Sequence, residues 1–85
     1  MTEKEIITLD EAQVAAERFL EERLKNLKNI SVEKVKLASI EGIVVYDVEG
    51  LATIGGKFLS RNRDCPFKIQ VAANDGAIVG YETQG

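Results

Sequence analysis

The chain has 85 residues, with 14 acidic and 11 basic side chains and a formal net charge of −3 at pH 7. This length allows one domain, residues 1–85, with a single core, and it excludes a deep substrate cavity between two lobes. The acidic balance argues against a general nucleic-acid coat, and no segment approaches the roughly 20 apolar residues of a membrane span.

The first predicted element is a helix that begins after Thr8. Thr8-Leu9-Asp10-Glu11 has the pattern of a capping box, in which the Thr8 hydroxyl accepts from the Glu11 amide and the Glu11 carboxylate accepts from the Thr8 amide. We expect a helix of roughly 20 residues, about 30 Å long. Apolar residues at steps of three and four predict its buried face: Ala12, Ala15, Ala16, Phe19, Leu20, Leu24 and Leu27.

The segments after this helix favour extended structure. A half-exposed strand is predicted over residues 32–40, followed by a turn at Glu41-Gly42. A strongly β-prone strand is predicted over residues 43–48 and continues through residues 51–54. Gly50 lies inside this second strand and indicates a bulge or a bend.

The last predicted element is a β-hairpin. Phe67, Ile69, Val71 and Ala73 alternate with more polar or smaller residues, which predicts a half-buried strand after Pro66. Asn74-Asp75-Gly76 supplies residues that tolerate positive φ in a tight turn, and a final strand follows through residues 78–81. Residues 55–64 are predicted to form either a long hairpin loop or a twisted extension of the two neighbouring strands.

These elements predict the fold class α+β, with one N-terminal helix packed on a four-stranded antiparallel meander sheet. The helix is expected to cover one sheet face and to leave the other open to solvent or to a partner.

The order of elements resembles the PepSY domain. The matching segments are Thr8-Leu9-Asp10-Glu11-Ala12 at the helix start, the β run 43–48, and Phe67-Lys68-Ile69-Gln70-Val71 before the Asn74-Asp75-Gly76 turn. The resemblance implies a cystatin-like helix-on-sheet architecture and a non-catalytic role, in some settings the regulation or inhibition of peptidases. Two departures are Ala72, where the family often has an aspartate, and residues 55–64, which have no clear counterpart.

The composition of the chain gives little support for catalysis or for a metal site. The chain has no histidine and one cysteine, Cys65, so it cannot form an internal disulfide or a nucleophile–histidine pair. We therefore predict no enzymatic activity, no cofactor and no metal; a small enzyme that uses Cys65 stays open as a third hypothesis. The lone thiol and the charged N-terminal segment, which lacks an apolar signal core, predict a cytoplasmic protein.

The candidate binding residues are basic side chains interleaved with an aromatic one: Lys57, Phe58, Arg61, Arg63 and Lys68. Our first hypothesis is a protein- or peptide-binding module that uses this segment, a strand edge or the open sheet face, and a homodimer through an edge or that face is also predicted. The alternative is nucleic-acid or nucleotide binding through the same basic residues. A solvated loop with Phe58 and Phe67 turned into the core is the third interpretation.

Overall fold

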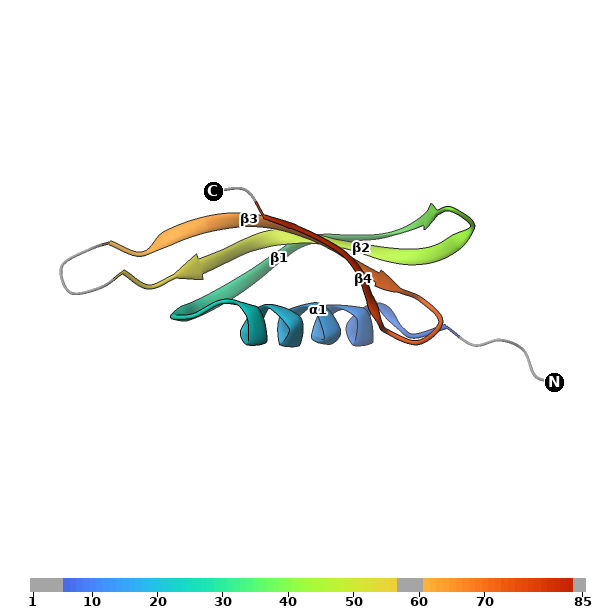
Figure 1. Ribbon diagram of the computed structural model, residues 1–85, viewed down its shortest axis with the longest axis horizontal. Helices are drawn as coiled ribbons and strands as arrows, with labels where there is room; N and C mark the ends of the chain where they lie inside the picture. Colours follow the sequence, from blue (N-terminus) through green and yellow to red (C-terminus); the bar gives the residue numbers. More distant parts are fainter. Residues whose placement is uncertain (1–5, 57–60, 84–85) are drawn as a thin grey trace.

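The computed structural model describes residues 6–56 and 61–83. Helix α1 (Leu9–Arg23) is followed by strands β1 (Leu27–Ile40), β2 (Ile43–Ile54), β3 (Arg63–Ala72) and β4 (Ile78–Thr83). The strands pair antiparallel in the order β1-β2-β3-β4, and α1 lies across one face of the twisted sheet (Figure 1). The predicted α+β meander is therefore confirmed.

The start of α1 has the predicted capping box. The Glu11 amide donates to the Thr8 hydroxyl at 3.1 Å, and the Thr8 amide donates to Glu11 Oε1 at 2.9 Å. Ala12, Ala16 and Leu20 on the sheet-facing side are fully buried. Because two of these three side chains are single methyl groups, the first half of the helix can approach the sheet closely.

The helix ends earlier than the apolar spacing predicts. It stops at Arg23 after 15 residues, Leu24 is already extended, and Asn26 adopts the left-handed conformation with φ 61. The chain therefore reverses, and Leu27 begins β1 instead of extending the helix. Leu24 and Leu27 still pack against the core, which is why their helix-like spacing was misleading.

The core lies between α1 and the two central strands. Tyr46, Val48, Ile69 and Val71 are buried under the helix, together with Phe67. At Tyr46 the core is also tied to the residue before the helix cap, because the Tyr46 hydroxyl donates to the carbonyl oxygen of Ile7 at 2.8 Å. The Ile7 amide donates to the carbonyl oxygen of Ala73 at 2.8 Å. Ile7 thus fixes the helix start against the sheet.

Both predicted turns are present. Glu41 and Gly42 have φ angles of 51 and 83, the two positive values of a type I′ hairpin turn. In the second turn the Gly76 amide donates to the carbonyl oxygen of Ala72 at 2.8 Å, and the Ala77 amide donates to Asp75 Oδ1 at 2.9 Å. These local hydrogen bonds explain why short polar segments were sufficient to predict the hairpins.

At Gly50 the backbone of β1 lies close against that of β2. Gly50 pairs with Val32, and the register shifts immediately afterwards because Glu33 is an extra, bulged residue of β1. The predicted irregularity thus lies in the strand opposite Gly50. A Cβ atom built on Gly50 would lie 2.9 Å from Val32 Cα and closer still to the carbonyl oxygen of Ser31, so this position has no room for a side chain.

The third strand begins earlier than predicted. β3 starts at Arg63, three residues before Pro66, and Arg63 and Asp64 pair with Ile54 and Thr53. Part of the segment 55–64 is therefore strand, as one of the two interpretations predicted, while residues 57–60 lie outside the described residues.

Candidate functional site

The sheet face that α1 leaves uncovered is polar and internally paired. Directly opposed residues of β2 and β3 form three interactions along this face, and all three join side chains that the register places side by side. Gln70 Nε2 donates to Asp47 Oδ1 at 3.3 Å, Thr53 Oγ1 donates to Asp64 Oδ1 at 2.8 Å, and Lys68 Nζ lies 3.9 Å from Glu49 Oε2.

The charges on this face alternate in sign across all four strands. In one row Lys34 of β1 lies opposite Glu49, Glu49 lies opposite Lys68, and Lys68 lies opposite Glu82 of β4. Opposite charges on directly facing residues stabilise an antiparallel sheet modestly. The open face therefore balances its own charge and offers little unpaired potential to a ligand.

The structure separates the members of the predicted basic segment. Lys57 and Phe58 lie outside the described residues, and Arg61 and Arg63 are exposed near the start of β3. Lys68 lies five residues beyond Arg63, roughly 16 Å along the strand, and the odd spacing puts it on the opposite sheet face. Arg63 and Lys68 are therefore not brought together.

Two neighbouring residues bear on the other interpretations of this segment. Phe67 is 4% exposed and belongs to the core, as the solvated-loop interpretation predicts for it. Cys65 is half-buried and lies opposite Ala52. The described residues contain no group of three or more histidine, cysteine, aspartate or glutamate side chains placed to hold a metal ion.

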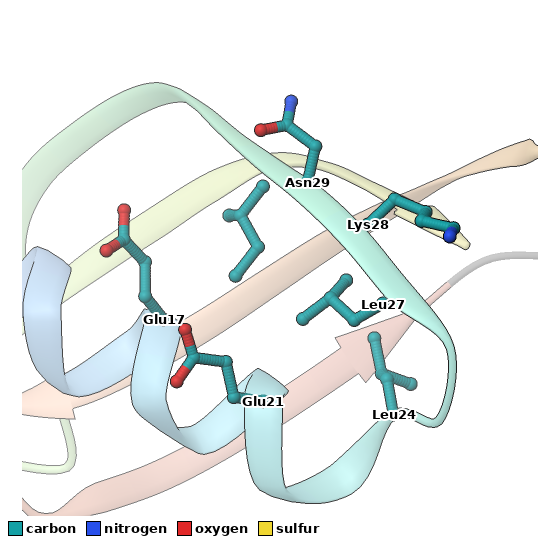
Figure 2. A pocket seen from close by; sticks show the side chains of 7 residues that line it. Glu17, Glu21, Leu24, Leu27, Lys28 and Asn29 are labelled. Atoms are coloured by element: carbon teal, nitrogen blue, oxygen red, sulfur yellow. The ribbon is translucent and has the colours of Figure 1, made fainter. Parts of the chain in front are cut away.

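A groove of about 440 Å³ lies between the C-terminal half of α1 and the start of β1 (Figure 2). Glu17 and Glu21, one helical turn apart, project from α1 along one wall. Leu24 and Leu27 face each other at the base, and Lys28 and Asn29 lie on the strand side (Figure 2). We call this the α1–β1 groove; its lining residues are Glu17, Glu21, Leu24, Leu27, Lys28, Asn29 and Ile30.

The chain reversal at Asn26 creates this groove. It returns β1 alongside the helix that it has just left, so residues close in sequence form both walls. The Gly55 amide donates to the carbonyl oxygen of Asn26 at 2.7 Å and anchors the reversal to the end of β2. Lys28 packs directly over Gly55, where an added Cβ would lie 2.6 Å from Lys28 Cε.

On the side of α1 away from the groove, aromatic side chains pack the C-terminal half of the helix against β4. Phe19 and Tyr81 of β4 meet edge to face with ring centroids 4.9 Å apart. The Arg23 guanidinium carbon lies 5.1 Å from the Phe19 centroid and 5.7 Å from that of Tyr81. This cluster holds the helix against the sheet and leaves the groove as the open side.

The groove residues were not part of the predicted site. Glutamates between apolar residues at helical spacing are typical of an ordinary solvated helix face, so the sequence does not single out Glu17 and Glu21. The signal that was available is Asn26, a residue that tolerates the left-handed conformation at a helix end. A helix that stops there returns the following apolar residues, Leu27 and Ile30, alongside the glutamates.

Both edges of the sheet carry features that discourage pairing with another strand. In β1, Lys28 and Glu33 are bulged residues, and in β4, which is six residues long, Val79 has no partner in the register. Bulges, edge lysines and short strands are devices by which natural sheets avoid edge-to-edge pairing. A ligand in the α1–β1 groove would therefore be held chiefly by side chains.

Comparison with family models, curated proteins and solved structures finds no match to this chain. The PepSY resemblance thus stays a prediction, and the candidate site is defined by geometry and charge. No helix in the described part of the chain has the length and apolar character that crossing a membrane requires.

Proposed function

We propose that the protein is a non-catalytic binding module that holds an extended, basic segment of a partner protein in the α1–β1 groove. The observation that carries this proposal is the combination of an apolar base with two carboxylates on one wall. Leu24, Leu27 and Ile30 offer apolar surface, and Glu17 and Glu21 lie above it.

This combination favours side chains with a long aliphatic stem and a cationic tip. A lysine or arginine side chain can lay its methylene groups on apolar surface while its charged group stays in water near a carboxylate. The charges of the groove fit such a ligand, because Glu17 and Glu21 outnumber Lys28. The net negative charge of the whole chain would also speed the approach of a basic segment.

The proposal agrees with the residue chemistry elsewhere. The chain has no histidine, and its one cysteine is half-buried in β3, so a binding role requires fewer assumptions than a catalytic one. If the PepSY resemblance reflects common ancestry, the bound segment would belong to a peptidase or to its substrate.

The test uses a short synthetic peptide of alternating lysine and valine, with a matched peptide in which glutamate replaces every lysine. We expect the lysine peptide to bind in the micromolar range, to shift the amide signals of Leu24, Leu27 and Ile30 in heteronuclear NMR spectra, and to bind more weakly as salt is raised. The glutamate peptide should leave these signals unchanged.

Charge variants locate the binding. Exposed ion pairs contribute about 0.2–1 kcal/mol each, so Glu17→Gln combined with Glu21→Gln should weaken lysine-peptide binding roughly 2- to 30-fold. Glu22→Gln is the matched control, because Glu22 is an exposed residue of the same helix that does not line the groove. Equal loss in the control, or equal binding of both peptides, would show that the groove is not the site.

A further inference from the structure

The α1–β1 groove has one basic residue among its lining residues, Lys28, and the Lys28 side chain points away from Glu17 and Glu21 (Figure 2). Within residues 6–56 and 61–83 the one ion pair joins Lys68 to Glu49, so Lys28 pairs with neither glutamate of the groove. Glu17 and Glu21 are four residues apart on the helix, a spacing at which like charges repel. Both carboxylates therefore favour a cation between them, yet the lysine at the rim of the groove does not take this position.

Gly55 accounts for the direction of the Lys28 side chain. It directly follows the end of β2 and is buried, although the next residue, Gly56, is exposed. The nearest atoms to a Cβ built on Gly55 are Lys28 Cε at 2.6 Å and Lys28 Cγ at 3.3 Å. The methylene stem of Lys28 thus lies on the bare backbone of Gly55 and fills the space that a side chain at this position would take.

The backbone fixes Lys28 and Gly55 beside each other. The Gly55 amide donates to the carbonyl oxygen of Asn26 at 2.7 Å, two residues before Lys28. Lys28 is the extra residue of the bulge between Leu27 and Asn29, so no residue of β2 lies directly opposite it. Its side chain therefore lacks a cross-strand neighbour and packs on Gly55, just beyond the end of the β1–β2 ladder.

We propose that Gly55 determines the charge selectivity of the α1–β1 groove by holding Lys28 outside it. With Lys28 on Gly55, the groove keeps two carboxylates for a cationic ligand; the hydrogen bond that Glu17 accepts from Gln13 Nε2 at 3.2 Å leaves the Glu17 charge uncompensated. A side chain at position 55 would displace the flexible stem of Lys28, and Glu17 and Glu21 would draw its ammonium group into the groove. There it would occupy the place of the ligand's cation. This inference rests on the proposed function and names the residue that keeps the groove acidic.

The first test needs no peptide. In NMR spectra of the unaltered chain, the ε-methylene protons of Lys28 should show nuclear Overhauser effects to the α-protons of Gly55 and none to the γ-methylene protons of Glu17 or Glu21. In Gly55→Ala, effects between Lys28 and the glutamates should appear. The matched control is Gly56→Ala, which adds the same methyl group at the next, exposed residue and should keep the pattern of the unaltered chain. Lys28–glutamate effects in the unaltered chain would overturn the inference.

The second test measures binding of the alternating lysine–valine peptide. Gly55→Ala should weaken binding about 1.5- to 5-fold, the effect of one exposed ion pair, and Gly56→Ala should not. Lys28→Met keeps an unbranched side chain and removes the charge. Added to Gly55→Ala, it should restore the affinity to that of Lys28→Met alone. An equal loss from Gly55→Ala with and without Lys28→Met would show that the added methyl group acts on the shape of the groove, and the inference would be wrong.

Together the two tests separate this inference from the proposed function. Overhauser effects that change as expected, in variants that all fail to bind the peptide, would contradict the proposed function while supporting the positioning of Lys28 by Gly55. Peptide binding that is the same in Gly55→Ala and in the unaltered chain would overturn the inference while the proposed function stands.

Discussion

Replacing Gly50 with alanine is the sharpest test of how the sheet is built. The substitution adds one methyl group at a buried position where β1 and β2 come into backbone contact. The nearest atoms are the carbonyl oxygen of Ser31 and, at 2.9 Å, the Cα atom of Val32. Because both belong to the backbone, they cannot rotate away as the tip of a flexible side chain would.

The expected loss of stability follows from two opposing effects. Overfilling a packed site costs about 1–3 kcal/mol, and a rigid backbone neighbour favours the upper end of this range. Alanine also restricts the unfolded chain, which returns about 0.4–1 kcal/mol when the native φ suits it. The net loss should be about 2 kcal/mol, or roughly 8–16 °C in melting temperature for a domain of this size.

The assay is urea denaturation followed by far-ultraviolet circular dichroism. Gly42→Ala is the control, because it adds the same methyl group in open space. Its positive φ costs alanine about 1–2 kcal/mol, and the same restriction of the unfolded chain offsets part of this, which leaves a net loss of about 1 kcal/mol. We expect Gly50→Ala to be clearly less stable than Gly42→Ala. If the two variants unfold at the same urea concentration, or if Gly50→Ala matches the wild type, the close approach of β1 to Gly50 is not a constraint on the fold.

Two further predictions concern the helix start and the basic segment. Tyr46→Phe removes the hydrogen bond to the Ile7 carbonyl and should lower the free energy of unfolding by about 1 kcal/mol in urea denaturation. Amide exchange at Ile7 should become faster. Unchanged exchange would argue against the anchoring of the helix start by Tyr46. The nucleic-acid alternative predicts that a short single-stranded DNA binds at low salt in fluorescence anisotropy and that Arg61→Glu with Arg63→Glu abolishes binding. Absence of wild-type binding would remove this alternative.

The parts of the fold that were predictable are those that local interactions determine. The helix start follows from the side chains of Thr8 and Glu11, and the turns follow from residues that tolerate positive φ. The helix end was not predictable from spacing, because Leu24 and Leu27 serve the same core from extended backbone. Their periodicity reports burial, and burial alone does not distinguish a helix from a chain that folds back over the same surface.

The candidate site was harder to predict because it depends on which residues the fold brings together, and neighbours in the sequence do not determine that. Clustering in sequence suggested that Arg63 and Lys68 act together, but a strand sends residues at odd spacing to opposite faces. The α1–β1 groove, in contrast, joins Glu17 to Ile30 only once the chain has reversed between them. The periodicity of the helix by itself could not show that Ile30 would lie beside Glu17.

The tie between Ile7 and the sheet has a consequence for the order of folding. Each strand pairs with the next strand in sequence, so the meander can form through short loops and at little entropic cost. The contacts of Ile7 with Tyr46 and Ala73 instead join the beginning of the described chain to residues far along it. We therefore expect the hairpins to form first and the helix to be secured last, so that rare openings of the native protein release α1 while the sheet stays paired.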